Sequence, residues 1–332
     1  MTAPLPLAVT MGEPAGIGGE LSLKAWLARK AVTRPFCVLD DPARLATLAC
    51  DLGLKVAIKE IKDPAETDAV FAAALPVIPV RLRTQTRAGH PDPANAPATL
   101  EAIERAAGLA KAGKIAGFAT NPIQKKTLQD AGFRHPGHTE FLAELAGGAE
   151  VAMMLAGPEL RVVPATIHLS LVEALRALDP AVIVRAGRIA AAGLKSLFGI
   201  DRPRLAVAAL NPHAGEQGTM GDEETRIIAP AVATLRRDGI DVRGPAPADT
   251  LFHPAARATY DAAICMYHDQ ALIPIKTIDF SGGVNVTLGL PYVRTSPDHG
   301  TALDIAGTGR ADPTSLIAAL AMADDMARRR KA

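Results

Sequence analysis

Short apolar runs alternate with longer amphipathic stretches along most of the chain. LPLAVTM is followed by LSLKAWLARKA, PFCVLD by PARLATLACDLG, and KIAGFAT by IQKKTLQDAG. A run of roughly four to eight apolar residues is typical of a buried strand, and apolar residues spaced three and four apart are typical of a helix. The repeated order predicts βα units, and hence an α/β fold with a mostly parallel sheet wrapped by helices.

The same alternation continues through the second half of the chain. Strands are predicted in AEVAMMLAG, LRVVPATIHL, RLAVAALNP and YDAAICMYHD, and helices in PAVIVRAGRIAAAGLKSLFG and EETRIIAPAVATLRRDG. Residues 82–97 are rich in proline, alanine and polar residues, which predicts a long loop or a linker. The length of 332 residues suits about two domains or one large α/β unit, and composition marks no boundary between domains.

Composition excludes several classes of protein. Hydrophobic residues make up 48% and charged residues 21%, unlike a disordered chain. The formal charge of +1 provides no general attraction to nucleic acid or to an anionic membrane. The three cysteines, Cys37, Cys50 and Cys265, have no CxxC spacing, and no apolar run approaches the roughly 20 residues of a membrane helix. We therefore expect a cytoplasmic protein with neither nucleic acid nor membrane as partner.

Three histidines occupy equivalent places in three separate βα units. Each is expected to end a predicted strand: His168 ends RVVPATI, His213 ends LAVAALNP, and His268 ends AAICMY. Ligands of open α/β sheets bind beyond the carboxyl ends of the strands, so strand topology can bring such residues together. Three imidazoles with one open position form a catalytic site for a divalent metal such as zinc, cobalt or nickel. The alternative is that each ring caps its strand and bonds to backbone.

Two further groups of residues are candidates for binding an anion. GHT, residues 137–139, precedes the helix-like run TEFLAELAG, so Thr139 is expected to be the N-cap beside N–H groups that would hold a phosphate oxygen. A plain cap is the alternative. Lys276, Asn285 and Arg294 recur at intervals of nine residues, and their ammonium, amide and guanidinium would together bind a phosphate or a carboxylate. Ordinary surface positions are the alternative for the two cations.

Other motifs give less direct signals. MGEPAGIGGE follows the first predicted strand but lacks the GxGxxG spacing of a dinucleotide-binding loop, so we expect a tight strand-to-helix turn that lines a cleft. GxSxG and HExxH are absent. Cys265 lies inside a predicted buried strand, where a thiol behaves as a small hydrophobe. Hydrolase triads are therefore disfavoured.

Several segments together resemble the family of 4-hydroxythreonine-4-phosphate dehydrogenases, the PdxA family, nearly from end to end. The matching segments are MGEPAGIGGE, TNPIQKK, GHTEFLAEL, ATIHLSL, LNPHAGEQG, CMYHDQALIPIK and GGVNVTLGLPYVRTSPDHGTALDIAGTG. The resemblance implies an isocitrate/isopropylmalate dehydrogenase-like fold, in which residues 1–332 form one catalytic unit of two α/β subdomains with a cleft between them. It also implies a homodimer whose active site is shared between the subunits.

The resemblance implies roles for individual residues. The metal ligands would be His168, His213 and His268. The substrate contacts would be His138, Thr139, Lys276, Asn285 and Arg294. HGTALDIAGTG resembles the nucleotide-binding loop of β-decarboxylating dehydrogenases, which implies cofactor contacts from His299, Gly300, Asp304 and Gly307. Asp249 and Asp269 are candidates to hold a metal ligand in place or to relay a proton, and a purely structural role is the alternative for both.

The implied activity is oxidation of 4-phosphooxy-L-threonine at its C3 hydroxyl, with NAD or NADP and one divalent metal (zinc, cobalt or magnesium) per active site. The product, 2-amino-3-oxo-4-phosphooxybutanoate, would decarboxylate to 3-amino-2-oxopropyl phosphate in pyridoxal 5'-phosphate (vitamin B6) biosynthesis. Departures from the usual family residues at Glu13, Gly19 and Gln124 leave room for a paralogue that oxidises another phosphorylated hydroxy acid or an aromatic dihydrodiol. A metal-dependent phosphoesterase is an alternative of another class, since a bound cation beside an anion pocket also suits hydrolysis.

Overall fold

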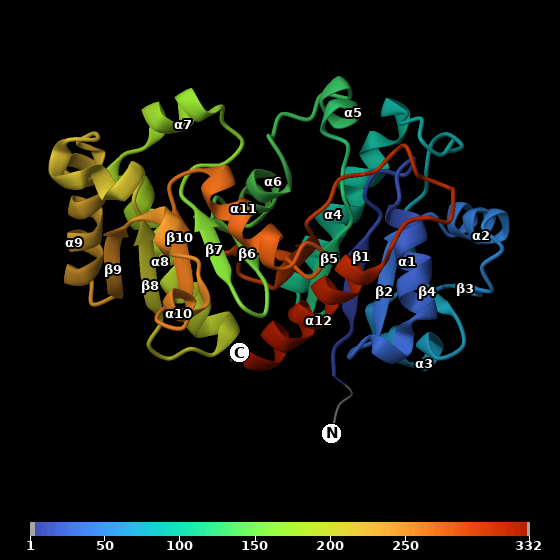
Figure 1. The fold of residues 1–332 in the computed structure, drawn as a ribbon. Helices are drawn as coiled ribbons and strands as arrows, with labels where there is room; N and C mark the ends of the chain where they lie inside the picture. The colour runs from blue at the N-terminus through green and yellow to red at the C-terminus, as the bar shows by residue number, and fades with distance from the viewer. Residues whose placement is uncertain (1–3, 331–332) are drawn as a thin grey trace. The chain divides into compact units, whose positions relative to one another are not determined.

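The computed structural model describes residues 4–330, which form two compact units. Unit 1 extends to Gly148 and resumes over Leu290–Arg328, and unit 2 comprises Ala149–Gly289 with Arg329 and Arg330. Helices flank the strands in each unit, as Figure 1 shows, so the α/β fold expected from the sequence is confirmed. Among residues 4–330, no helix has both the length and the apolar character that crossing a bilayer requires.

Unit 1 contains six strands, each parallel to its neighbours, in the order β3-β4-β2-β1-β5-β12. The strands are β1 (Leu7–Thr10), β2 (Phe36–Asp40), β3 (Ile58–Glu60), β4 (Leu75–Pro79), β5 (Gly117–Thr120) and β12 (Arg294–Pro297). The helices are α1 (Gly18–Leu27), α2 (Pro42–Asp51), α3 (Thr67–Phe71), α4 (Ala96–Lys111), α5 (Lys125–Asp130), α6 (His138–Leu145) and α12 (Thr314–Arg329). In the core, Ala102 and Ile103 of α4 belong to one buried cluster with Ala8 of β1 and Phe118 of β5.

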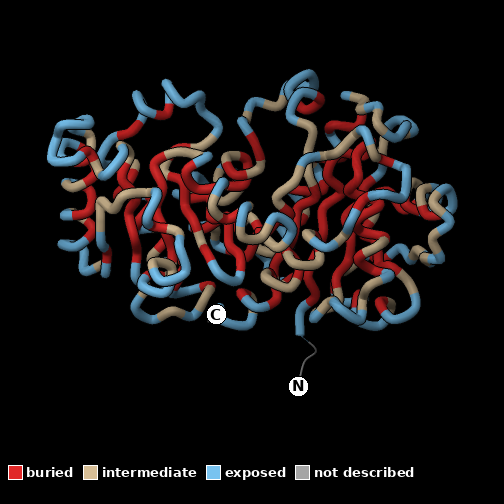
Figure 2. The backbone as a smooth tube through the Cα atoms, viewed as in Figure 1, coloured by how far each residue is buried: buried red, intermediate tan, exposed pale blue. Residues whose placement is uncertain are grey.

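Unit 2 contains six strands in the order β11-β6-β7-β10-β8-β9. The strands are β6 (Ala152–Ala156), β7 (Arg161–Pro164), β8 (Arg204–Ala208), β9 (Asp241–Ala246), β10 (Ala262–Cys265) and β11 (Val284–Leu288). β6 is antiparallel to β7 and to β11, and the other pairs are parallel. The helices are α7 (Leu171–Ala177), α8 (Pro180–Phe198), α9 (Ala229–Arg237), α10 (Pro254–Arg257) and α11 (His268–Ile278). Leu272 and Ile275 of α11 share a buried cluster with Val162 of β7 and Cys265 of β10. Most strands of the two units are buried in Figure 2, whereas the edge strands β3 and β9 are mostly exposed or half-buried.

Two loops differ in how well the sequence predicted them. The turn after β1 is tight as expected: Gly12 has φ +70°, and a Cβ atom there would lie 2.7 Å from the Cβ of Asn121, which excludes a side chain. Residues 82–97 are not a linker, because they remain within unit 1 and lead into α4. The Oδ1 atom of Asn95 accepts hydrogen bonds from the backbone N–H groups of Arg83 and Thr84, which holds this loop in place.

Candidate active site

The three candidate metal ligands follow three neighbouring parallel strands of unit 2, because β10 lies between β7 and β8. His168 comes four residues after the end of β7 and His213 five residues after β8, whereas His268 comes three residues after β10, as the first residue of α11. The expectation that the histidines end the strands is therefore wrong in detail, since the chain leaves the sheet before each of them. The fold nevertheless places all three beyond the same edge of the sheet.

Two of these histidines have an uncommon backbone conformation. His168 has φ 56° and His213 has φ 52°, in the left-handed region that residues other than glycine rarely adopt. Residues 213–217 all have positive φ. Strained conformations of this kind concentrate at functional sites, where the surrounding structure maintains them. The backbone therefore supports a functional role for both loops.

Carboxylates lie beside two of the histidine rings. The Oε2 atom of Glu216 is 3.2 Å from Nδ1 of His213, and the Oδ1 atom of Asp269 is 2.7 Å from Nδ1 of His268. A carboxylate at one ring nitrogen fixes the tautomer and leaves the other nitrogen to bind a ligand. This arrangement fits the predicted part of Asp269 in holding a metal ligand.

The side chains do not form a complete metal site within the described chain. Among residues 4–330, no group of three or more His, Cys, Asp or Glu side chains is close enough together to hold a metal ion. His213, Asp249 and Asp269 do line one pocket of about 470 Å³ in unit 2. Topology and chemistry thus support the three histidines as ligands, and their convergence on one ion stays a prediction.

The start of α6 in unit 1 differs from the expected cap. The N-cap is Gly137, without a side-chain hydrogen bond, and the helix begins at His138. Thr139 is the second helical residue and is buried, so its assignment as the N-cap is wrong. The first N–H groups of an α-helix have no partner within the helix, so this end can still accept an anion.

Arg294 is buried in unit 1, which excludes the ordinary surface position that was its alternative. Its Nη2 group donates a hydrogen bond to Oγ1 of Thr120 at 2.5 Å. Burial lowers the pKa of Arg294 to about 10, and Tyr292 offsets part of that effect. A buried guanidinium of this kind is a strong donor to a phosphate or a carboxylate.

Burial also holds the pKa of His138 well below its usual value of 6.5, and the charges of Arg294 and Lys125 lower it further. The ring is therefore neutral at neutral pH. Its Nε2 atom is buried and has no hydrogen-bond partner among residues 4–330. An unsatisfied buried polar atom calls for a ligand or water, which agrees with the predicted substrate contact.

The other two predicted substrate residues, Lys276 and Asn285, lie in unit 2. Lys276 is in the last turn of α11, and its Nζ atom is 5.6 Å from the ring centre of Phe280. Asn285 is in β11, and its Oδ1 atom is buried without a hydrogen-bond partner in the described part of the chain. Arg294 belongs to unit 1, so the convergence of Lys276, Asn285 and Arg294 on one anion stays a prediction.

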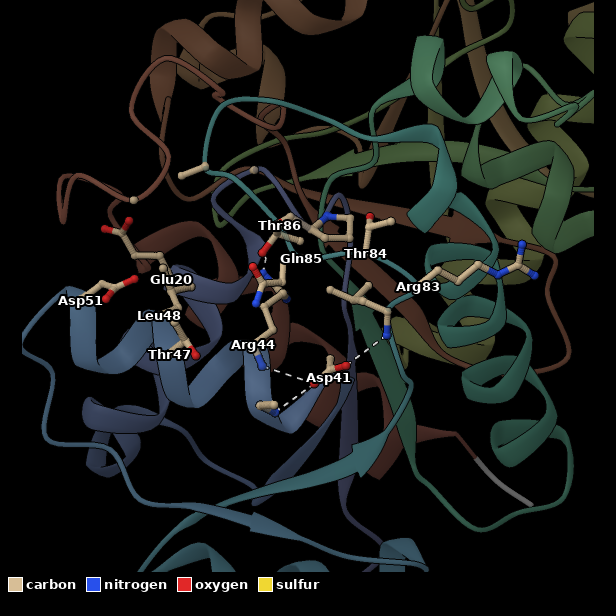
Figure 3. Close-up of a pocket in the computed structure, with 16 residues that line it drawn as sticks. Glu20, Asp41, Arg44, Thr47, Leu48, Asp51, Arg83, Thr84, Gln85 and Thr86 are labelled. Carbon is tan, nitrogen blue, oxygen red and sulfur yellow. Dashed lines mark hydrogen bonds between the residues drawn. The ribbon is translucent and has the colours of Figure 1, made fainter.

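The predicted cofactor loop connects β12 to α12 in unit 1. The Nδ1 atom of His299 lies 3.0 Å from the backbone oxygen of Gly300. Gly307, with φ 71°, lines a pocket of about 480 Å³, shown in Figure 3, whereas His299, Gly300 and Asp304 lie in the same loop outside the pocket lining. This volume is within the range of about 300–1,000 Å³ that is common for small-molecule sites.

The expected turn after β1 forms one wall of this pocket, with Gly16 and Glu20 in its lining. Sequence reasoning missed the other walls, which come from segments that follow β2 and β4 and include Asp41, Arg44, Thr84 and Gln85. Arg44 is fixed by an ion pair with Asp40 at 2.6 Å and by the backbone oxygen of Pro14 at 2.9 Å. The pair Asp40-Asp41 directly after the apolar run of β2 was the available signal, because polar residues at a strand end mark the ligand-binding edge.

Comparison with known proteins agrees with the resemblance seen in the sequence. The sequence model of the family described as "Pyridoxal phosphate biosynthetic protein PdxA" matches residues 31–323. The chain belongs to the PdxA family. Two members named 4-hydroxythreonine-4-phosphate dehydrogenase, from Bradyrhizobium diazoefficiens and Paracoccus denitrificans, are each 55% identical to it. The alignments cover 97% and 99% of this chain and 97% and 100% of the relatives.

A solved structure of the PdxA family also superposes on this chain. The crystal structure of 4-hydroxythreonine-4-phosphate dehydrogenase from Klebsiella pneumoniae is 38% identical and gives a TM-score of 0.86, over 97% of this chain and 99% of that chain. The family resemblance and the α/β fold that the sequence predicted are both confirmed.

Proposed function

We propose that this chain is a 4-hydroxythreonine-4-phosphate dehydrogenase of pyridoxal 5'-phosphate biosynthesis. It would oxidise the C3 hydroxyl of 4-phosphooxy-L-threonine to the ketone of 2-amino-3-oxo-4-phosphooxybutanoate, which then loses carbon dioxide to give 3-amino-2-oxopropyl phosphate. The observation that carries the proposal is the 55% identity, over almost the whole chain, to two proteins that bear this name.

The role proposed for the anion-binding residues is orientation of the substrate. Arg294 is buried and held by Thr120, so its guanidinium is fixed before the substrate arrives. His138 and Thr139 begin α6, whose first N–H groups would be available to a bound anion. Lys276 and Asn285 complete the proposed set. Binding the remote phosphate firmly would convert binding energy into correct placement of the C3 hydrogen.

The residues available for a metal suit a divalent cation. Three imidazoles follow adjacent parallel strands, and carboxylates hold the Nδ1 side of His213 and His268. We assign His168, His213 and His268 as the ligands of zinc, cobalt or magnesium, with Asp269 and Asp249 beside them. A bound divalent cation lowers the pKa of a coordinated hydroxyl and polarises the product ketone.

The residues around Gly307 suit a nicotinamide cofactor. Loops from the carboxyl ends of β1, β2 and β4 enclose the pocket of about 480 Å³, the usual location of ligands in α/β folds. These residues would hold NAD or NADP, and the oxidised nicotinamide would supply the acceptor for the hydride that leaves C3. Glu20, Asp41 and Arg44 supply fixed polar groups for the rest of that cofactor.

A cytoplasmic homodimer with shared active sites is the assembly we propose. Seven of the nine large hydrophobic side chains that are exposed among residues 4–330 belong to unit 2. Four of them lie within seven residues after His168: Leu169, Leu171, Val172 and Leu175. An exposed apolar cluster of this kind is typical of a protein interface. The three cysteines are free thiols, as expected in a reducing compartment.

A coupled assay tests the proposed function. The purified chain is incubated with 4-phosphooxy-L-threonine, a divalent metal and NAD or NADP, and reduced nicotinamide and inorganic phosphate are both measured. We expect reduced nicotinamide to form, and the dephosphorylated analogue to lose kcat as well as affinity. Release of phosphate without reduced nicotinamide would instead identify a phosphoesterase. Activity only with another phosphorylated hydroxy acid or a dihydrodiol would identify a paralogue.

A further inference from the structure

Lys125 lies against the N-terminus of α6. It is the first residue of α5, and a Cβ atom placed on Gly137 would be 3.6 Å from its Cε atom and 3.9 Å from its Nζ atom. Gly137 is the N-cap of α6, immediately before His138 and Thr139. The ammonium of Lys125 is therefore beside the helix end that is expected to receive the substrate.

The ammonium of Lys125 is not engaged by the protein. Among residues 4–330, no side chain or backbone group forms a hydrogen bond or an ion pair with it, whereas the neighbouring Lys126 pairs with Asp130. Glu140 is the acid near Gly137, with its Oε2 atom 3.6 Å from the same Cβ position, and it forms no ion pair with Lys125. Two adjacent lysines of one helix thus differ: one is paired and one is available.

The positive charges of Lys125 and Arg294 both act on the imidazole ring of His138. After the larger effect of burial, both cations lower the pKa of His138. Each therefore lies close enough to raise the electrostatic potential at this ring. The buried Nε2 atom of His138, which has no partner among residues 4–330, adds a polar group that can contact an anion at this place. The Oε2 atom of Glu140 is also buried without a hydrogen-bond partner in the described chain, and it is the opposing charge near Gly137.

We propose that Lys125 is an additional ligand of the substrate's phosphate, beside His138, Thr139 and Arg294 in unit 1. This inference rests on the proposed function for the identity of the substrate. A phosphate dianion has three acceptor oxygens, more than one guanidinium satisfies. An exposed ammonium on a flexible stem is a point charge that moves onto the ligand as it binds. Lys125 would thus contribute to affinity and to placement of the substrate.

Comparing substitutions of Lys125 and Lys126 distinguishes a direct contact with the phosphate from a general effect of positive charge. In the full chain, Lys125→Gln should lower kcat/KM for 4-phosphooxy-L-threonine by about 10- to 100-fold, the value of a charge-assisted hydrogen bond. It should change kcat/KM for the dephosphorylated analogue by less than about twofold, and Lys125→Arg should recover part of the loss. Lys126→Gln, which removes the same charge one residue away, should behave as the unmodified chain. Equal losses for the two substrates would overturn the proposal.

Binding of inorganic phosphate provides a measurement that needs no turnover. Titration followed by thermal unfolding gives a dissociation constant, because a ligand that binds only the folded chain stabilises it. We expect Lys125→Gln to weaken inorganic phosphate by about 10-fold, and Lys126→Gln to leave it unchanged. A dissociation constant unchanged by Lys125→Gln, or no binding to the unmodified chain, would overturn the inference. If phosphate binding depends on Lys125 but 4-phosphooxy-L-threonine is not oxidised, the proposed function fails and the anion site stands.

Discussion

Arg294 and Thr120 join two neighbouring parallel strands of unit 1 through a buried side-chain hydrogen bond. Nη2 of Arg294, the first residue of β12, donates to Oγ1 of Thr120, the last residue of β5, at 2.5 Å. Both side chains are buried, with exposures of 2% and 0%. The bond holds the guanidinium at the carboxyl end of β5, next to the segment that leads into α5. Thr120 is thus a positioning residue for the proposed phosphate site.

Thr120→Val tests this positioning role. The variant keeps the shape of the side chain and removes the acceptor, which leaves one N–H of a buried guanidinium without this partner. We expect the free energy of unfolding to fall by about 1–3 kcal/mol, and KM for the phosphorylated substrate to rise several-fold. Denaturant unfolding and steady-state kinetics measure the two effects. Thr120→Ser, which retains the hydroxyl, is the matched control, and a Val variant with the control's KM would contradict the role.

The depressed pKa of His138 predicts a pH dependence of stability. Because the folded pKa lies below the unfolded value of 6.5, the unfolded chain binds more protons between the two values, and stability falls as pH drops through 6.5. We expect His138→Gln to lose less free energy of unfolding than the unmodified chain between about pH 8 and pH 5. An identical loss in both chains would show that His138 titrates normally.

The same residue has a direct spectroscopic test. In the ligand-free chain, the ¹⁵N shifts of the His138 ring should remain those of a neutral imidazole at pH 6.5, because the pKa of this ring lies well below its usual value of 6.5. Inorganic phosphate should move the midpoint upward, because a bound dianion favours the protonated ring. A midpoint that does not respond to phosphate would place the anion elsewhere.

The predicted strands and helices appear in the observed order where the sequence signals were local, whereas β3, β4 and β9 were not predicted. Asp41 and Asp179 cap the predicted helices α2 and α8 through their own side chains, and such caps are visible in a sequence. α7, which Ser170 caps in the same way, was not predicted. The ends of the strands were placed too late. Ala209 and Met266 are buried although they follow β8 and β10, so an apolar run reports burial and not pairing.

Features that depend on distant partners could not be predicted. An ordinary surface position was the alternative for Arg294. Its burial could not be predicted, because its partner Thr120 is 174 residues away in sequence. The antiparallel direction of β6 was also missed, because a strand buried on both faces has the same apolar pattern in either direction. Whether the three histidines meet at one ion depends on which strands are neighbours in the sheet, and the spacing of the histidines in the sequence does not specify that order. The observed order supports their convergence.

Removal of one imidazole tests the proposed metal site. We expect His213→Ala to lose bound metal and to lower turnover by at least about 100-fold. A catalytic site of this kind holds its metal with three protein ligands and leaves the fourth position open for substrate. Elemental analysis and the coupled assay measure these losses, and circular dichroism should show an unchanged fold. His90→Ala, at an exposed loop position in unit 1, is the control and should retain both metal and activity. Full activity of His213→Ala after chelation would exclude a metal role.

The exposed apolar side chains of α7 predict where the proposed dimer forms. Leu171 and Val172 are each 57% exposed in a helix that follows His168 by three residues, and Figure 2 shows this helix mostly exposed. A charge placed there would be buried without a partner if a second chain covered the helix, which is strongly unfavourable. Leu171→Glu should therefore shift the mass measured by light scattering from dimer to monomer. Leu27→Glu, at a leucine 39% exposed on α1, should leave the dimer intact.

Activity distinguishes a shared active site from a simple association. If ligands come from both chains, Leu171→Glu should have low activity at dilute protein and should recover as the concentration rises, because mass action restores the dimer. Leu27→Glu should have a specific activity independent of concentration. A monomeric Leu171→Glu variant with full activity would show that each chain holds a complete site, and the three histidines would then have to converge within unit 2 alone.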